Sequence, residues 1–153
     1  MNKEEKPSNI CLPTREYLPG EKEIIKKILG MKRVAIVGIS DKQDRPSFHV
    51  ASYLASQGYE VVPINPNLQE WMGKKSYPEL AAVPHQIDVV DVFRKPEAVP
   101  PLVHEAIRVG AKAVWLQEEV ISPQAQTIAK QAGIFFVMDR CMMKEHMRLK
   151  AEI

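Results

Sequence analysis

Five short apolar runs, rich in valine and isoleucine, recur along the chain and constrain its fold more than any other feature. The runs cover residues 34–37, 61–64, 87–93, 113–116 and 134–138. Runs of this length that are apolar at nearly every position are typical of strands covered on both faces of a parallel sheet. The pattern therefore predicts five buried, parallel strands.

Segments with helical periodicity separate most of these runs, and glycines mark their ends. The spacing of apolar residues predicts helices over residues 21–29, 50–55, 99–107 and 125–132, and a last helix over 142–150. Gly30, Gly58, Gly110 and Gly133 stand where helices commonly end. The second connection, residues 65–84, offers only a short helical stretch at 79–83. Strands that alternate with helices indicate βαβ units.

The predicted fold class is therefore α/β, a Rossmann-like, three-layer, doubly wound sheet of about five parallel strands. Right-handed crossovers give the strand order 3-2-1-4-5 most simply. Residues 1–19, interrupted by Pro7, Pro13 and Pro19, are interpreted as an N-terminal extension, and residues 20–153 as a single domain. In such folds, ligands bind at the carboxyl ends of the strands, so the site is expected in the loops after the five runs.

Charge and composition exclude several classes of protein. The 153 residues include 21 basic and 19 acidic ones, and this balance argues against a nucleic-acid or membrane-surface partner. No apolar stretch approaches the ~20 residues that cross a bilayer. The two cysteines, Cys11 and Cys141, lie far apart and in no metal-ligand spacing. The sequence predicts a cytoplasmic protein with reduced thiols, and leaves a protein partner or a homo-oligomer open.

The loop after the first run departs from the dinucleotide-binding fingerprint. Its six positions, from Gly38 to Gln43, read GISDKQ, so only the first glycine of GxGxxG is present. Pro46 suits the first turn of a helix that begins later than usual. After the second run, Asn65 and Pro66 stand where an NAD-binding protein usually carries an acid for the ribose. These departures disfavour an NAD(P)-dependent oxidoreductase, and the alternative function stays such an oxidoreductase or another nucleotide enzyme with an atypical Rossmann loop.

Basic residues occur in two of the candidate loops. Lys42 and Arg45 follow the first run, and Arg94 and Lys95 follow the third. Because the carboxyl ends of parallel strands share one edge, these side chains are expected near one another. Together they favour a ligand that carries several phosphates.

Several stretches together carry a resemblance to a known family. The stretches "VAIVGIS" and "RPSFHVASYL", "GYEVVPINP", "IDVVDVFRKPE", "EAIRVGAKAVWLQ" and "VMDRCMMKEHMRL" occur in order. They resemble the small stand-alone CoA-binding domain proteins, relatives of the N-terminal domain of the succinyl-CoA synthetase alpha subunit. The resemblance covers residues 30–149 and leaves out the first 20 or so.

This resemblance implies a non-catalytic protein that binds coenzyme A or an acyl-CoA at the strand ends. It also implies which residues bind the ligand, counted along the five loops. They are Gly38, Ile39, Ser40, Lys42, Arg45, Pro46 and Ser47, then Asn65 and Pro66, then Phe93, Arg94, Lys95 and Pro96, and last Trp115 and Gln117. Asn65 and Pro66 are implied to lie near the adenosine end.

Two positions depart from the family's usual pattern. Ile39 replaces a small residue and is expected to narrow the pocket. Glu118 and Glu119 stand in a segment that often reads glycine-valine in the family. These carboxylates would repel a polyanion, so either binding through this loop is weak or the pantetheine, rather than a phosphate, passes there.

The remaining reactive residues form no catalytic set, and the chain is too short for the second domain of the synthetases. Cys141 has two interpretations: a thiol with a lowered pKa at a helix N-terminus, able to form a mixed disulfide with CoA, or a small buried hydrophobe. Asp91 interrupts a strand, which a salt bridge, an edge position or catalysis would explain. A third functional hypothesis is a protein-interaction platform that uses an exposed Trp71.

Overall fold

A parallel sheet of five strands forms the centre of the computed structural model, which describes residues 15–153. The strands are β1 (Arg33–Val37), β2 (Glu60–Ile64), β5 (Val89–Val92), β6 (Ala113–Leu116) and β7 (Phe135–Val137). Each lies within a predicted run or extends it by one residue, and all four pairings are parallel. The α/β, Rossmann-like fold class is therefore confirmed.

The order of the strands differs from the simplest expectation. The third main strand, β5, pairs with β1 and β6, so the order is β2-β1-β5-β6-β7 rather than 3-2-1-4-5. Pro63 gives the physical reason, because a proline within a strand is confined to a sheet edge. Its carbonyl points away from β1 and accepts a hydrogen bond from the backbone N–H of Tyr77. β2 is thus an edge strand, and the order reverses between β1 and β5.

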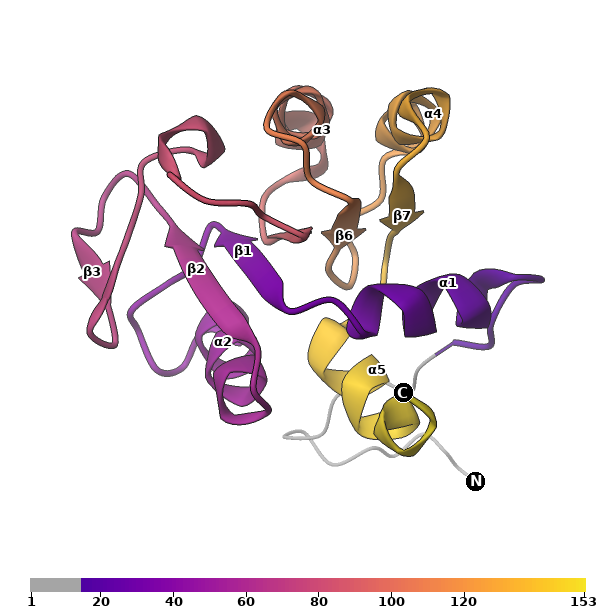
Figure 1. Ribbon diagram of the computed structural model, residues 1–153, viewed down its shortest axis with the longest axis horizontal. Coiled ribbons are helices and arrows are strands. Elements are labelled where there is room, and N and C mark those ends of the chain that lie inside the picture. Colours follow the sequence, from indigo (N-terminus) through magenta and orange to yellow (C-terminus); the bar gives the residue numbers. More distant parts are fainter. Residues whose placement is uncertain (1–14) are drawn as a thin grey trace.

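Five helices cover the sheet on its two faces (Figure 1). One face carries α1 (Glu21–Leu29), α2 (Pro46–Ser56) and α5 (Met142–Leu149). The other face carries α3 (Val99–Arg108) and α4 (Pro123–Ala132). Short 3-10 turns occupy Leu80–Ala82, Pro96–Ala98 and Lys150–Glu152. The predicted helices are all present, because each has a local apolar face that the sheet buries.

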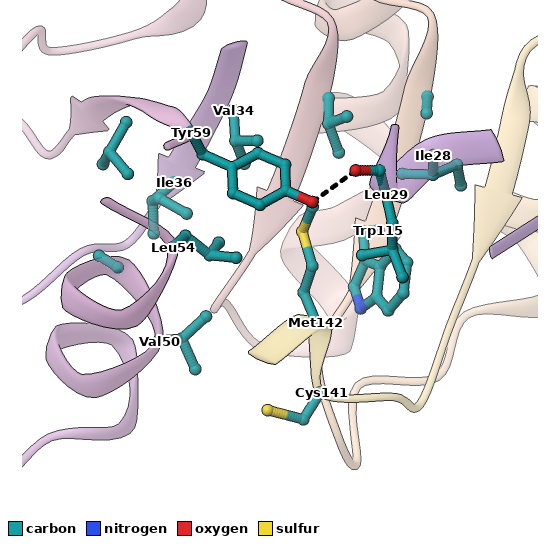
Figure 2. Close-up of a cluster of buried hydrophobic side chains, with 14 of the residues drawn as sticks. Ile28, Leu29, Val34, Ile36, Val50, Leu54, Tyr59, Trp115, Cys141 and Met142 are labelled. Carbon is teal, nitrogen blue, oxygen red and sulfur yellow. Dashed lines mark hydrogen bonds between the residues drawn. The ribbon is translucent and has the colours of Figure 1, made fainter. Parts of the chain in front are cut away.

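The core under α1, α2 and α5 joins distant parts of the chain (Figure 2). Met142 of α5 extends between the rings of Tyr59 and Trp115. The Tyr59 hydroxyl donates a hydrogen bond to the carbonyl oxygen of Leu29, which ties the end of α1 to the start of β2. Each fully buried side chain of this size contributes about 1.5–3 kcal/mol to folding.

The irregular second connection contains a small antiparallel hairpin, β3 (Glu70–Trp71) and β4 (Lys74–Lys75). Its two turn residues, Met72 and Gly73, have φ angles of 50° and 80°, as a type I′ turn requires. Trp71 is only 2% exposed and packs edge-to-face on Phe48, with ring centroids 5.5 Å apart. The expectation of an exposed Trp71 is therefore wrong.

The segment before α1 is held by the buried Arg140. Its guanidinium donates to the carbonyl oxygens of Arg15 and Glu16 and to the carboxylates of Glu21 and Glu145. Of the predicted extension, residues 1–14 lie outside the described residues. The part that follows them packs on the domain through these bonds.

Candidate functional site at the carboxyl edge of the sheet

Gly38 ends β1 and sets the close approach of the first and third loops. Its φ is 88°, and a Cβ on it would lie 2.5 Å from the carbonyl oxygen of Phe93 and 3.1 Å from Cδ of Arg94. Only glycine fits a left-handed conformation with a neighbouring backbone this close. Gly38 therefore allows Arg94 to lie directly over the end of β1.

Two serines shape the first loop, which runs from Gly38 to Arg45. The backbone N–H of Ser40 donates to Oγ of Ser47 at 2.9 Å, and the N–H of Lys42 donates to Oγ of Ser40 at 3.0 Å. Pro46 then starts α2 at a position where its missing N–H has no effect on the helix. The predicted Ser40 and Ser47 thus determine the shape of the loop that precedes the helix.

The second connection fixes the first loop from outside. Nδ2 of Asn65 donates to the carbonyl oxygen of Ile39 at 2.7 Å, and Nε1 of Trp71 donates to that of Ser40 at 2.9 Å. Trp71 is a site residue that sequence reasoning missed, although a tryptophan next to a two-residue turn requires a partner for its indole N–H if buried. The side chain of Ile39 is fully buried in the core. The expectation that Ile39 narrows the pocket is wrong, because this side chain points into the core.

Three grooves that share lining residues follow the carboxyl edge. The fourth-loop groove, of about 670 Å³, is lined by Pro46, Phe93, Arg94, Lys95, Pro96, Gln117, Glu118, Glu119 and Val120. The second-loop groove, of about 450 Å³, is lined by Val37, Gly38, Ile64, Asn65, Pro66, Asn67, Pro78, Glu79, Leu80, Phe93, Arg94, Leu102 and Glu105. The hairpin groove, of about 650 Å³, shares Asn65, Pro66 and Pro78 with it. Phe93 and Arg94 line the first two grooves, so a long ligand could cross from one to the other at this point.

Of the four predicted basic residues, two line a groove and two lie exposed on the first loop. Arg94 and Lys95 line the fourth-loop groove. Lys42 and Arg45 are exposed on the first loop and line none of the three grooves. Glu118 pairs with Lys144 at 2.5 Å. The fourth-loop groove thus has basic groups toward the third loop and acidic groups toward the fourth.

The two predicted residues of β6 and its loop have different positions. Trp115 is fully buried, and its Nε1 donates to the carbonyl oxygen of Arg140 at 2.7 Å. It supports the fifth loop from within the core and lines none of the three grooves. Gln117 lines the fourth-loop groove, and its Oε1 accepts the N–H of Met142 at 3.2 Å.

The model of one protein family, described as the CoA binding domain, matches residues 32–147. The chain belongs to the CoA-binding domain family. An uncharacterised protein of Bacillus subtilis, YneT, is 34% identical over 128 residues, which are 84% of this chain and 95% of that protein. A hypothetical protein from Pyrococcus horikoshii has a solved structure with a TM-score of 0.84 and 40% identity, covering 91% of this chain and 99% of that one.

One further relative is much longer than this CoA-binding domain. The ADP-forming acetate–CoA ligase II of Archaeoglobus fulgidus is 25% identical over 115 residues, which are 67% of this chain. The matched region is only 17% of that ligase. This supports the resemblance to larger CoA-dependent synthetases while leaving most of the ligase without a counterpart in the match.

Cys141 of this CoA-binding domain is 5% exposed, at the N-terminus of α5 (Figure 2). Burial raises the pKa of its thiol, although the backbone N–H of Lys144 and the side chain of Gln117 act in the opposite direction. Of the two interpretations of Cys141, the thiol with a lowered pKa is therefore wrong. The structure agrees with the other interpretation, in which Cys141 is a small buried residue at a strand–helix junction.

Asp91 is fully buried in β5, which is the central strand and not an edge of the sheet. Its carboxylate forms no salt bridge with any residue in the range 15–153. Neither carboxyl oxygen has a hydrogen-bond partner among residues 15–153. Burial raises the pKa of this carboxyl well above its usual range and so favours its protonated form. Both structural explanations expected for Asp91 are thus wrong.

Neither a metal-binding cluster nor a membrane-spanning helix is found among residues 15–153. No group of three or more His, Cys, Asp or Glu side chains there could hold a metal ion. In the same range, no helix has the length and apolar character needed to span a membrane.

Proposed function

We propose that this chain binds coenzyme A or an acyl-CoA along the carboxyl edge of its sheet and does not itself catalyse a reaction. The observation that carries the proposal is the position of Arg94 between the fourth-loop and second-loop grooves, over Gly38. An arginine there can hold the pyrophosphate of a ligand that extends into both grooves. Membership of the CoA-binding domain family supports CoA as that ligand.

The chemistry of the two grooves favours one orientation of the ligand. The second-loop groove combines Asn65 and Asn67 with the apolar Leu80 and Leu102, which suits an adenosine. The fourth-loop groove combines Phe93 and Val120 with carboxylates, which suits the uncharged pantetheine better than a phosphate. We propose that Arg45 and Lys42, exposed on the first loop, meet a phosphate of the ligand from solvent.

The alternative, an NAD(P)-dependent oxidoreductase, has one observation in its favour. Glu79 and Glu105 line the second-loop groove, and a carboxylate there could bind a ribose hydroxyl. However, Glu105 already accepts the backbone N–H of Ala81 at 3.2 Å. The position directly after β2, where an NAD-binding protein usually carries an acid, is Asn65, which has no carboxylate. We therefore treat NAD and NADP as competing ligands in the test.

Calorimetric titration with CoA, 3′,5′-ADP, NAD and NADP tests the proposal. We expect CoA to bind with the highest affinity, and Arg94→Ala to weaken it about tenfold or more, as expected for a lost charge-assisted contact. Arg108→Ala is the matched control, because Arg108 is exposed at the end of α3 and lines none of the three grooves. Indifference to CoA, or tighter binding of NAD or NADP, would refute the proposal.

The Cys141 thiol and the cellular context stay as predictions. A mixed disulfide between Cys141 and CoA requires α5 to open, because the thiol is buried. A mass spectrum of the native protein would detect such an adduct or co-purified CoA. We propose a carrier or sensor of CoA in the cytoplasm, whose bound state is read by a protein partner or a second copy.

A further inference from the structure

Two residues at the ends of neighbouring strands adopt a conformation that is unusual for residues with side chains. Glu119, after β6, has a φ of 71°, and Asp139, after β7, has a φ of 60°. A left-handed conformation costs a residue with a Cβ about 1–2 kcal/mol. Such backbone strain concentrates where the surrounding structure fixes a functional geometry.

A direct hydrogen bond joins the two residues. The backbone N–H of Glu119 donates to Oδ1 of Asp139 at 2.8 Å. Asp139 is itself held, since its Oδ2 lies 3.7 Å from Nε of Arg15, and Nη2 of Arg15 donates to the carbonyl oxygen of Met138 at 3.0 Å. These contacts therefore fix the fourth loop to the fifth loop.

The charge that this arrangement presents to the groove is negative. Two carboxylates line the groove from the fourth loop, and that of Glu118 is paired with Lys144. Glu119 is exposed, and no cation among residues 15–153 lies within ion-pair distance of its carboxylate. The basic residues of the same groove, Arg94 and Lys95, line it from the third loop.

We infer that Glu119, whose backbone is held by Asp139, lowers the affinity of this domain for acyl-CoAs whose acyl group carries a free carboxylate. The inference rests on the proposed function, in which the pantetheine and its acyl group extend along the fourth-loop groove. An ionised carboxylate on the acyl group would then lie near the carboxylate of Glu119 and be repelled by it. A neutral acyl group in the same place would not be repelled. Repulsion between like charges several ångströms apart near a protein surface corresponds to a roughly three- to tenfold difference in affinity.

Calorimetric titrations with acetyl-CoA and succinyl-CoA, together with CoA itself, test this inference. At low ionic strength, we expect the wild-type protein to bind acetyl-CoA about three- to tenfold more tightly than succinyl-CoA, and the difference to shrink at high salt. Glu119→Gln should remove most of the difference. Glu119→Gly should do the same, and its backbone suits the left-handed φ, so it keeps the fold intact.

Glu97→Gln is the matched control, because it removes the same charge from an exposed residue that does not line the groove. It should keep the preference for acetyl-CoA. Equal affinity of the wild-type protein for the two acyl-CoAs, or an unchanged preference in Glu119→Gln, would overturn the inference while leaving CoA binding in place. A protein that binds none of the three ligands would instead refute the proposed function, and this inference with it.

Discussion

The carbonyl oxygen of Phe93 lies 2.5 Å from the place where a Cβ on Gly38 would stand. This approach brings the third loop over the end of β1, and with it the arginine that lies between the two grooves. The conformation of one glycine thus connects the local backbone to the shape of the candidate site.

Gly38→Ala tests that connection. The substitution combines a left-handed φ of 88° with a steric overlap against the backbone of Phe93, which cannot move aside easily. We therefore expect the free energy of unfolding to fall by about 2–4 kcal/mol. Urea denaturation measures the change. Gly58→Ala is the control, because Gly58 also has a positive φ but would place its Cβ in open space. A loss no larger at Gly38 than at Gly58 would contradict the steric explanation.

Trp71→Phe should loosen the first loop while keeping the aromatic contact with Phe48. The variant lacks the N–H that donates to the carbonyl oxygen of Ser40. Leaving that oxygen without its partner costs about 1–3 kcal/mol. We expect a corresponding decrease in the free energy of unfolding and weaker CoA binding, measured by denaturation and calorimetry. Unchanged values of both would show that the hairpin does not support the loop.

Asp91 should make stability depend on pH. Its folded-state pKa is raised by burial, while in the unfolded chain an aspartate ionises near pH ~3.9. The folded protein therefore keeps a proton that the unfolded chain releases, and the contribution of Asp91 to stability is fully present below that pH and is lost as pH rises toward the folded-state pKa.

Asp91→Asn does not titrate, so its stability relative to wild type should increase with pH. Denaturation at about pH 5 and about pH 8 would show a difference of roughly 1 kcal/mol or more between the two conditions. A variant whose relative stability is the same at both values would indicate that Asp91 has a partner in solution.

His146 should act in the opposite sense. Burial lowers its pKa, and the charges of Lys150 and Lys32 lower it further. Its contribution to stability is present above the unfolded-state pKa of about 6.5 and is lost as pH falls through the folded-state value. His146→Gln should flatten the acid side of a stability profile, whereas His104→Gln, at an exposed position, should not. Identical acid profiles for wild type and His146→Gln would contradict this assignment.

The helices and strands could be predicted because their signals are local. The apolar face of residues 21–29 and the glycine that follows it determine α1 without reference to the rest of the chain. The strand order depends on contacts between distant segments, and the one sequence signal for it was Pro63, which marks β2 as an edge strand. An edge position for β2 still leaves the order of the other four strands to be decided by contacts that no local pattern encodes.

The site was predictable in part. The loops after β1, β2, β5 and β6 do supply the groove residues, because parallel strands bring their carboxyl ends to one edge. The burial of Trp71 and Ile39 could not be predicted, since it depends on how the hairpin and the first loop pack on each other. The burial of the Cys141 thiol likewise depends on how α5 packs on the sheet, which no local pattern encodes.

A titration of the isotope-labelled protein with CoA, followed by backbone amide NMR signals, tests the central claim most directly. We expect saturable shifts at Gly38, Phe93, Arg94 and Gln117, on the carboxyl edge, and none at Arg108, at the end of α3. Shifts that are absent, or that are confined to residues away from the three grooves, would contradict the claim that this domain binds CoA at the carboxyl ends of its strands.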